Sequence, residues 1–160
     1  MPGLNNWIAA VKNVFNLAEP AVLTVDSPYY HLHRGSDHFH SVGDVYPTLA
    51  DGVPLTAGPL WTLSTFVEIV PINTITAEFD IHFISVEGLD TNDVYELHLF
   101  QGGSDVLVGK KRFTKNAVQD GIVNVPFQTP VIPANARIRG KLASAAGGSV
   151  ATISIGYHIY

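Results

Sequence analysis

The chain has 160 residues and a formal net charge of −5, which excludes a general affinity for nucleic acid because phosphate binding needs excess positive charge. It contains no cysteine, which excludes a disulfide framework and thiolate chemistry. Only 14% of the residues are charged and 46% are hydrophobic, yet no run approaches the roughly 18 apolar residues of a membrane span, so we expect the apolar excess in subunit contacts.

The first 20 residues differ from the rest of the chain. Apolar side chains recur there every three or four residues, which is typical of one helix face, and Pro20 ends the pattern. We interpret residues 1–20 as a short N-terminal amphipathic arm. It either packs across the end of the following domain or docks on a neighbouring subunit, since so short a helix is marginal alone. Its candidate partner-binding residues are Leu4, Trp7, Ile8, Val11 and Phe15.

The stretch from Val22 to Tyr46 holds four of the seven histidines, as two His-x-His pairs around a turn-like Arg34–Asp37 segment. Residues two apart on an extended strand share a face, so a hairpin here would bring imidazoles together as ligands for zinc, nickel or copper. The spacing matches no structural zinc motif, and ordinary strand, loop or interface histidines explain it more simply. We therefore predict no resident metal or other cofactor. The candidates are His31, His33, His38 and His40.

The remainder of the chain reads as short strands separated by turns. Residues 48–59 predict a loop, and a strand is expected from Leu60 to Val70. Two long strands of alternating apolar and polar side chains fill Thr74 to Phe100, and turn residues at 87–93 predict that they form a hairpin. Four more strands are expected at 106–114, 121–127, 137–142 and 150–160.

This pattern predicts an all-β fold for residues 21–160. Seven strands from Leu60 onward, with extended chain before them, favour an antiparallel double-sheet sandwich, specifically an eight-stranded jelly roll. An immunoglobulin-like sandwich is the alternative, although its cysteine and tryptophan markers are absent. The start of the chain shows no basic leader with an apolar block, so we expect no signal peptide and synthesis in a cytoplasm.

Catalytic motifs are scarce. No Gly-x-Ser-x-Gly elbow occurs, and Val108–Lys111 lacks the glycine spacing and the following helix of a phosphate loop. Carboxylates on one outer sheet face would suit glycoside hydrolysis, but charged residues on a wet face are the commoner finding. We predict no enzyme activity. The residues concerned are Glu78, Asp80 and Glu96, together with His82 and His98.

The charges segregate along the sequence. Seven of the nine basic residues lie between Lys110 and Lys141, and thirteen of the fourteen acidic residues lie at or before Asp105. This pattern either follows from the strand faces or serves assembly, in which a basic flank of one subunit meets an acidic flank of the next. The candidate subunit-contact residues are Lys110, Lys111, Arg112, Arg137, Arg139, Lys141, Glu78, Asp80 and Glu96.

Four stretches carry a resemblance to a known family. They are the extended LTVDSPYYHLHRGSDHFHSVGDVYP, the alternating strands of Thr74 to Phe100, the proline-framed VPFQTPVIPANARI and the closing ATISIGYHIY. Together they resemble the small jelly-roll structural proteins of tailed bacteriophage virions, such as capsid decoration and tail-associated proteins. The resemblance implies a virion location, no catalytic residues, and a homotrimer or ring that docks on other virion proteins, such as the major capsid or tail protein.

Two other classes of function remain open. Exposed aromatic rings would stack on sugars in a carbohydrate- or receptor-binding module of a phage tail or head fibre, and jelly rolls often serve as lectins. The aromatic candidates are Trp61, Tyr29, Tyr30 and Tyr46. A hydrolase or metal-dependent enzyme is the remaining alternative. Neither nucleic acid nor a membrane is expected as a partner.

Overall fold

The computed structural model describes residues 44–116 and 123–160. In these ranges the chain forms strands and one short 3-10 helix, η1 (Leu49–Asp51), and no helix there has the length and apolarity needed to cross a bilayer. The strands are β1 (Asp44–Tyr46), β2 (Val53–Thr56), β3 (Val67–Val70), β4 (Phe79–Glu87), β5 (Val94–Gln101), β6 (Val106–Thr114), β7 (Val123–Pro126), β8 (Ile138–Ser144) and β9 (Val150–Ile159).

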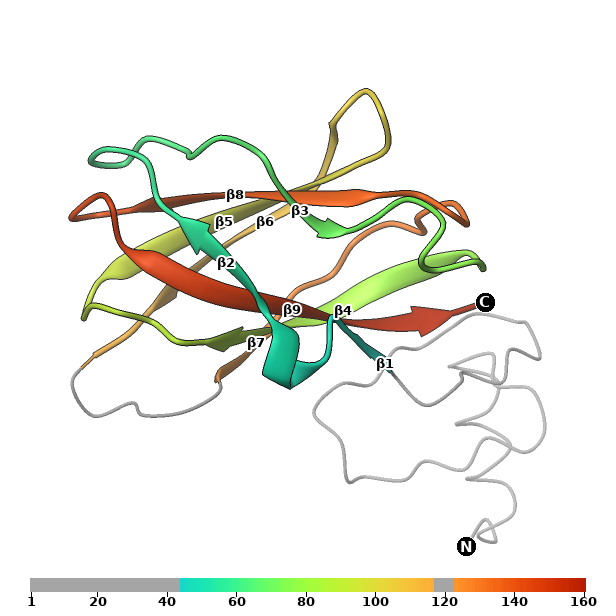
Figure 1. Ribbon diagram of the computed structural model, residues 1–160, viewed down its shortest axis with the longest axis horizontal. Coiled ribbons are helices and arrows are strands. Elements are labelled where there is room, and N and C mark those ends of the chain that lie inside the picture. The colour runs from blue at the N-terminus through green and yellow to red at the C-terminus, as the bar shows by residue number, and fades with distance from the viewer. Residues whose placement is uncertain (1–43, 117–122) are drawn as a thin grey trace, which may run out of the picture. The chain divides into compact units, whose positions relative to one another are not determined.

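The strands form two antiparallel sheets, which lie one above the other as the two layers in Figure 1. The first, here called the β9 sheet, has the order β1–β9–β4–β7, and β2 pairs with the other half of the same β9 edge. The second, the β8 sheet, has the order β3–β8–β5–β6. The predicted all-β double-sheet sandwich is therefore confirmed.

The pairing is nested along the chain. Strand β5 pairs with β6, β4 with β7, β3 with β8 and β2 with β9, as though one long hairpin had been rolled up. Consecutive strands therefore alternate between the sheets everywhere from β2 to β9 except at β5–β6. This order is that of a jelly roll, and it differs from the strand order of an immunoglobulin sandwich.

The prediction that the two central strands, β4 and β5, pair with each other as a hairpin is wrong. Strand β4 lies in the β9 sheet and β5 lies in the β8 sheet, so the turn residues 88–93 carry the chain from one layer to the other. The connection from β8 to β9 crosses in the same way. Local turn chemistry specifies that the chain reverses, but the pairing partner of a strand is set by the nested long-range contacts.

Two predicted boundaries also need correction. The stretch 48–59, expected to be a loop, contains β2, which pairs with β9 and tolerates Pro54 because β2 lies at a sheet edge. The strand expected from Leu60 begins only at Val67. Trp61 has a backbone φ of 53°, in the left-handed region, and the amide of Thr62 donates to the carbonyl of Pro59, so this segment is a turn.

The core lies between the sheets and takes alternate residues from each strand, as the period of two requires. Polar side chains between them point to the outer faces. The ring of Tyr95 stacks on that of Phe113 at a centroid distance of 5.4 Å. The largest fully buried side chains are Tyr95, Phe79, Leu55, Ile69, Ile81, Ile84, Leu97, Leu99, Ile132, Ile138, Leu142 and Ile153.

A β-bulge interrupts β4 at His82. Ile81 pairs with Tyr157 of β9, whereas Phe83 pairs with the very next residue, Gly156, so His82 is the inserted residue. Beyond the bulge Ile84 enters the core, whereas strict alternation from Phe79 and Ile81 would place Phe83 there. Bulges re-aim the side chains around them, and this one lies at the polar cluster described below.

Asp93 ties together the two crossovers at one end of the sandwich. Its carboxylate accepts hydrogen bonds from the amide of Val94 at 2.7 Å, the amide of Ala146 at 3.0 Å and the hydroxyl of Ser149 at 3.1 Å. The β4–β5 and β8–β9 connections are thereby joined. Burial of this carboxyl raises its pKa, but the hydrogen bonds from Ala146, Val94, Ser149 and Ser144 outweigh burial and leave the pKa lowered.

Candidate functional site

A cluster of three potential metal ligands lies on the outer face of the β9 sheet. Asp80 and His82 belong to β4, and His158 belongs to β9. Asp80 and His158 are direct register partners across the two strands. Because Phe79, Ile81 and Tyr157 on either side of them enter the core, these polar side chains take the opposite face.

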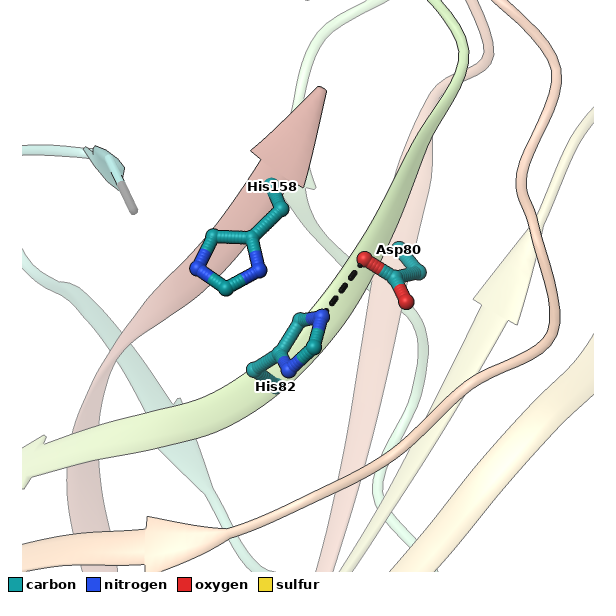
Figure 2. Close-up of side chains that lie close together, drawn as sticks. All are labelled: Asp80, His82 and His158. Carbon is teal, nitrogen blue, oxygen red and sulfur yellow. Dashed lines mark hydrogen bonds and ion pairs between the residues drawn. The ribbon is translucent and has the colours of Figure 1, made fainter. Parts of the chain in front are cut away.

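The three side chains are close together. His82 Nε2 lies 2.7 Å from Asp80 Oδ1, and the His82 and His158 rings have centroids 4.0 Å apart at 46°. One ligand atom from each residue lies within 4.8 Å of the other two. Figure 2 shows the His158 ring beside that of His82, and a dashed line joins His82 to Asp80 of the same strand.

The cluster is shielded from solvent. The side chains of Asp80 and His82 are only 5% and 10% exposed. The hydroxyl of Tyr160 donates to Asp80 Oδ2 at 2.9 Å, so the two oxygens of this carboxylate have different partners. Burial, followed by the hydrogen bond to Asp80 and the charge of Asp80, raises the pKa of the Tyr160 phenol to about 12.

This arrangement can hold a cation. His82 Nε2 and Asp80 Oδ1 are at hydrogen-bond distance, and the tautomer of the histidine decides which of its ring nitrogens donates. Two imidazoles and one carboxylate also form a donor set that suits a divalent transition metal. Within residues 44–116 and 123–160, no other group of at least three such ligands comes equally close together.

A second polar cluster lies on the outer face of the β8 sheet. Glu96 accepts two hydrogen bonds from Arg112, at 2.7 and 3.2 Å, and is 2.8 Å from His98 Nε2. The hydrogen bonds with His98 and then Arg112 lower the pKa of Glu96. The guanidinium of Arg112 also lies 4.7 Å from the centre of the Trp61 ring. This cluster joins β5, β6 and the loop before β3.

Phe66 forms the centre of a third group on the same face. The guanidinium of Arg139 lies 4.2 Å and the ammonium of Lys141 lies 4.0 Å from the centre of its ring, and Phe100 meets it edge-on at 5.0 Å. Arg139 is also paired with Asp105 of the same chain. These basic side chains are therefore already engaged within the subunit.

The structure separates the predicted subunit-contact residues into two kinds. Asp80 and Glu96 are bound to side chains of their own chain. Arg137 donates to the carbonyl of Gly102. Of the predicted residues, the exposed side chains with no such partner among residues 44–116 and 123–160 are Glu78, Lys110 and Lys111. Contact between subunits stays a prediction, and these three residues are now its strongest members.

The carboxylates considered for glycoside hydrolysis do not share one face. Asp80 and His82 lie on the outer face of the β9 sheet, whereas Glu96 and His98 lie on the outer face of the β8 sheet, across the core. That expectation is wrong because it assumed that β4 and β5 pair. Sequence reasoning also missed that His158 joins Asp80 and His82, since this requires knowing that β9 pairs with β4.

Several predicted residues lie outside the described ranges. The arm of residues 1–20, with its five partner-binding residues, belongs to this set, as do Tyr29 and Tyr30 and the histidines at 31, 33, 38 and 40. The boundary between the arm and the sandwich stays a prediction. Of the aromatic candidates for sugar binding, Tyr46 packs against the core and Trp61 is 44% exposed.

No protein-family model matches this chain, and neither does any curated protein. Among solved structures it is similar to a chain of the infectious bursal disease virus Gt strain, with 16% identity, a TM-score of 0.42 and coverage of 87% of this chain and 36% of that chain. The Gx strain and a mutant VP2 protein of the same virus in derived T=1 particles each give 15% identity, a TM-score of 0.37 and coverage of 84% and 36%. The chain thus spans about a third of these proteins.

Proposed function

We propose that this protein is a non-enzymatic structural component of a virion, specifically a capsid decoration or cement protein of a tailed bacteriophage. The supporting fold is the jelly roll, which recurs among viral capsid domains and also among lectins and cupins. A fold alone does not select among these functions, so the surface must distinguish them. The observation that carries it is a set of exposed apolar side chains in a chain with only 14% charged residues.

Four of these apolar side chains belong to one end of the sandwich. In the β8 sheet, Val70, Ile138, Gln101 and Val106 form one register row at that end. In the β9 sheet, Phe79 faces Ile159 and bridges Ile132. The β3–β4 and β7–β8 connections meet there, because the amide of Asn73 donates to the carbonyl of Asn135. The exposed apolar residues at this end include Ile72, Val106, Val131 and Ile159.

Such an end suits contact with a second copy of the chain. Scattered exposed apolar residues are normal on a monomer, but several at one end of a weakly charged domain are typical of an interface. In this proposal apolar burial holds a homotrimer together, and the charges set its register. The N-terminal arm adds a second contact, to a neighbouring subunit or to another virion protein. Deleting residues 1–16 would then leave the sandwich folded and weaken docking.

The test is the oligomeric state of the untagged full chain, measured by size-exclusion chromatography with light scattering. The expected result is a trimer of the 17.3 kDa chain. Ile72→Ser should shift it toward monomer, whereas Leu60→Ser at the opposite end should not. The two residues are matched controls because they are 65% and 66% exposed. A wild-type monomer at micromolar concentration would contradict self-assembly. Genes for capsid, portal or tail proteins beside its own are expected.

A carbohydrate- or receptor-binding role on a phage tail or head fibre is the second candidate. The observation that favours it is the exposed indole of Trp61, which has Arg112 near its ring. Aromatic rings with a polar neighbour stack on sugar rings and bond their hydroxyl groups. A glycan array would separate the two functions. Specific binding that Trp61→Ala abolishes would support this second candidate, and an empty array would remove it.

A further inference from the structure

We propose that Asp80, His82 and His158 form a binding site for a divalent transition metal, with zinc as the ion of choice. The inference is independent of the virion role. Its basis is the juxtaposition of two imidazoles and one carboxylate from two paired strands, with ligand atoms within 4.8 Å of one another. Figure 2 shows these side chains converging from β4 and β9.

The chemistry of the donors selects the class of ion. Zinc in proteins takes histidine nitrogen and carboxylate oxygen at about 2.0–2.2 Å, with four ligands arranged as a tetrahedron. Calcium and magnesium prefer shells made wholly of oxygen, so two imidazoles disfavour them. Three protein ligands leave the fourth position for water or for a group from outside the chain.

The geometry needs only a small adjustment to hold an ion. Tetrahedral ligands at these bond lengths stand about 3.4 Å apart. The present 2.7 Å between Asp80 Oδ1 and His82 Nε2 would lengthen as the ion replaces the shared proton. His158 would approach by rotation of its side chain within the 4.8 Å spread of the donors.

The surroundings hold the ligands in place. Asp80 and His158 are register partners on two central strands, and His82 is the inserted residue of a bulge whose carbonyl accepts the amide of Phe127 at 3.0 Å. Tyr160 engages Asp80 Oδ2 and thereby leaves Oδ1 on the side of His82. Hydrogen bonds of this kind orient metal ligands and add to their affinity.

The chain supplies its own control. On the other sheet, Glu96 and His98 are also two residues apart and 2.8 Å from each other. There the carboxylate is engaged by Arg112, and the pair belongs to no group of three ligands among the described residues. A metal should therefore distinguish the two carboxylate–histidine pairs. If both are only hydrogen-bonded pairs, replacing the histidine or carboxylate of either pair should have the same effect on metal binding.

The experiment is a zinc titration of the untagged full chain after treatment with a chelator, with affinity measured by competition against a chromophoric chelator. The background carries His31→Asn, His33→Asn, His38→Asn and His40→Asn, so that these four histidines cannot compete for the metal. One zinc per chain is expected, with affinity at least about tenfold lower in His158→Gln and in Asp80→Asn and unchanged in His98→Gln. Cobalt(II) should give a visible absorption band that His158→Gln removes.

Circular dichroism of the metal-free variants shows whether each one folds. Asp80→Asn keeps the size of the side chain and an oxygen for Tyr160, so it decides the matter if His158→Gln does not fold. Zinc bound only in the presence of the four N-terminal histidines would overturn the proposal. The same holds if neither site variant binds zinc more weakly than His98→Gln.

Discussion

Phe83 lies over Gly156 on the outer face of the β9 sheet, where a Cβ added to residue 156 would stand 2.1 Å from Phe83 Cζ. The two residues are register partners, and the bulge at His82 brings them together. The aromatic ring thus fills the space left by the missing side chain. Glycine at this position is required by packing, since its backbone is not in the left-handed region.

Gly156→Ala is therefore expected to destabilise the domain. The added methyl group must displace the Phe83 ring, and overpacking of this kind lowers the free energy of unfolding by about 1–3 kcal/mol. Urea denaturation measures the change. Gly103→Ala is the matched control, because a Cβ there meets nothing within 4 Å. Equal stability of the two variants would show that the ring moves aside without cost.

Asp93→Ala is expected to loosen the two crossovers that Asp93 joins. The change removes the acceptor of the hydrogen bonds from Val94, Ala146 and Ser149, and we expect a loss of about 1–3 kcal/mol in the free energy of unfolding. Amide hydrogen exchange should show faster exchange at residues 146–149.

The control for Asp93→Ala is Glu68→Ala, which removes an exposed carboxylate and should leave stability within about 0.5 kcal/mol of wild type. The prediction also has a pH signature. Because the folded pKa of Asp93 is lowered, its contribution is present above the unfolded value of 3.8 and is lost as pH falls through the folded pKa. If Asp93→Ala leaves the acid sensitivity of unfolding unchanged, the hydrogen bonds that Asp93 accepts do not contribute measurably to stability.

Glu96→Gln should reduce the dependence of stability on acid pH. Hydrogen bonds with His98 and Arg112 hold the folded pKa of Glu96 below 4.5. The stabilisation is therefore present above the unfolded pKa and disappears as pH falls through the folded pKa. The free energy of unfolding, measured from neutral pH to about pH 3, should fall less steeply in Glu96→Gln.

At neutral pH the loss in Glu96→Gln should be only about 0–1 kcal/mol, because the pair with Arg112 is close to solvent. Added salt should shrink the difference between wild type and variant. A variant with the same pH slope as wild type would show that these hydrogen bonds persist equally in the unfolded chain or contribute nothing.

The sequence predicted the layers of this fold better than their connections. Period-two alternation correctly assigns the core residues of β5 and β8 and most of those of β9, because successive side chains of a strand point to opposite faces. At the end of β9 it fails, since Ile159 is exposed. The same rule fails in β4 at His82, because a bulge shifts the phase by one residue and is not visible in the pattern. Strand β2 was missed because two prolines and two glycines outweighed four pairing residues.

The sequence predicted only part of the candidate metal site. Asp80 and His82 are two residues apart and were assigned to an outer face from the sequence alone. His158 lies on the last strand, 76 residues further along the chain than His82. Their meeting depends on the β4–β9 pairing, which is a long-range contact that no local signal encodes. The four histidines whose spacing suggested metal ligands, at residues 31, 33, 38 and 40, lie outside the described residues.

Two exposed lysines on β6 are candidates to guide assembly. This strand is an edge of the β8 sheet, and its exposed Lys110 and Lys111 have, within the described part of the chain, no partners like those that engage Arg112, Arg139 and Lys141. Reversing both lysines to Glu should slow homotrimer assembly, because they would repel an acidic residue such as Glu78 of a neighbour. The thermal midpoint of each variant should stay close to wild type, since both side chains are exposed.

Light scattering after dilution, recorded over a range of salt concentrations, measures this effect. Each exposed pair contributes only about 0–1 kcal/mol and is screened by salt, so the difference between wild type and variant should vanish at high ionic strength. Adding Glu78→Lys to the double variant should restore assembly. Lysine on an edge strand also prevents unwanted strand pairing between molecules. If reversal leaves assembly unchanged while Lys110→Thr with Lys111→Thr causes aggregation, edge protection is their role, and the charges that guide assembly must lie elsewhere.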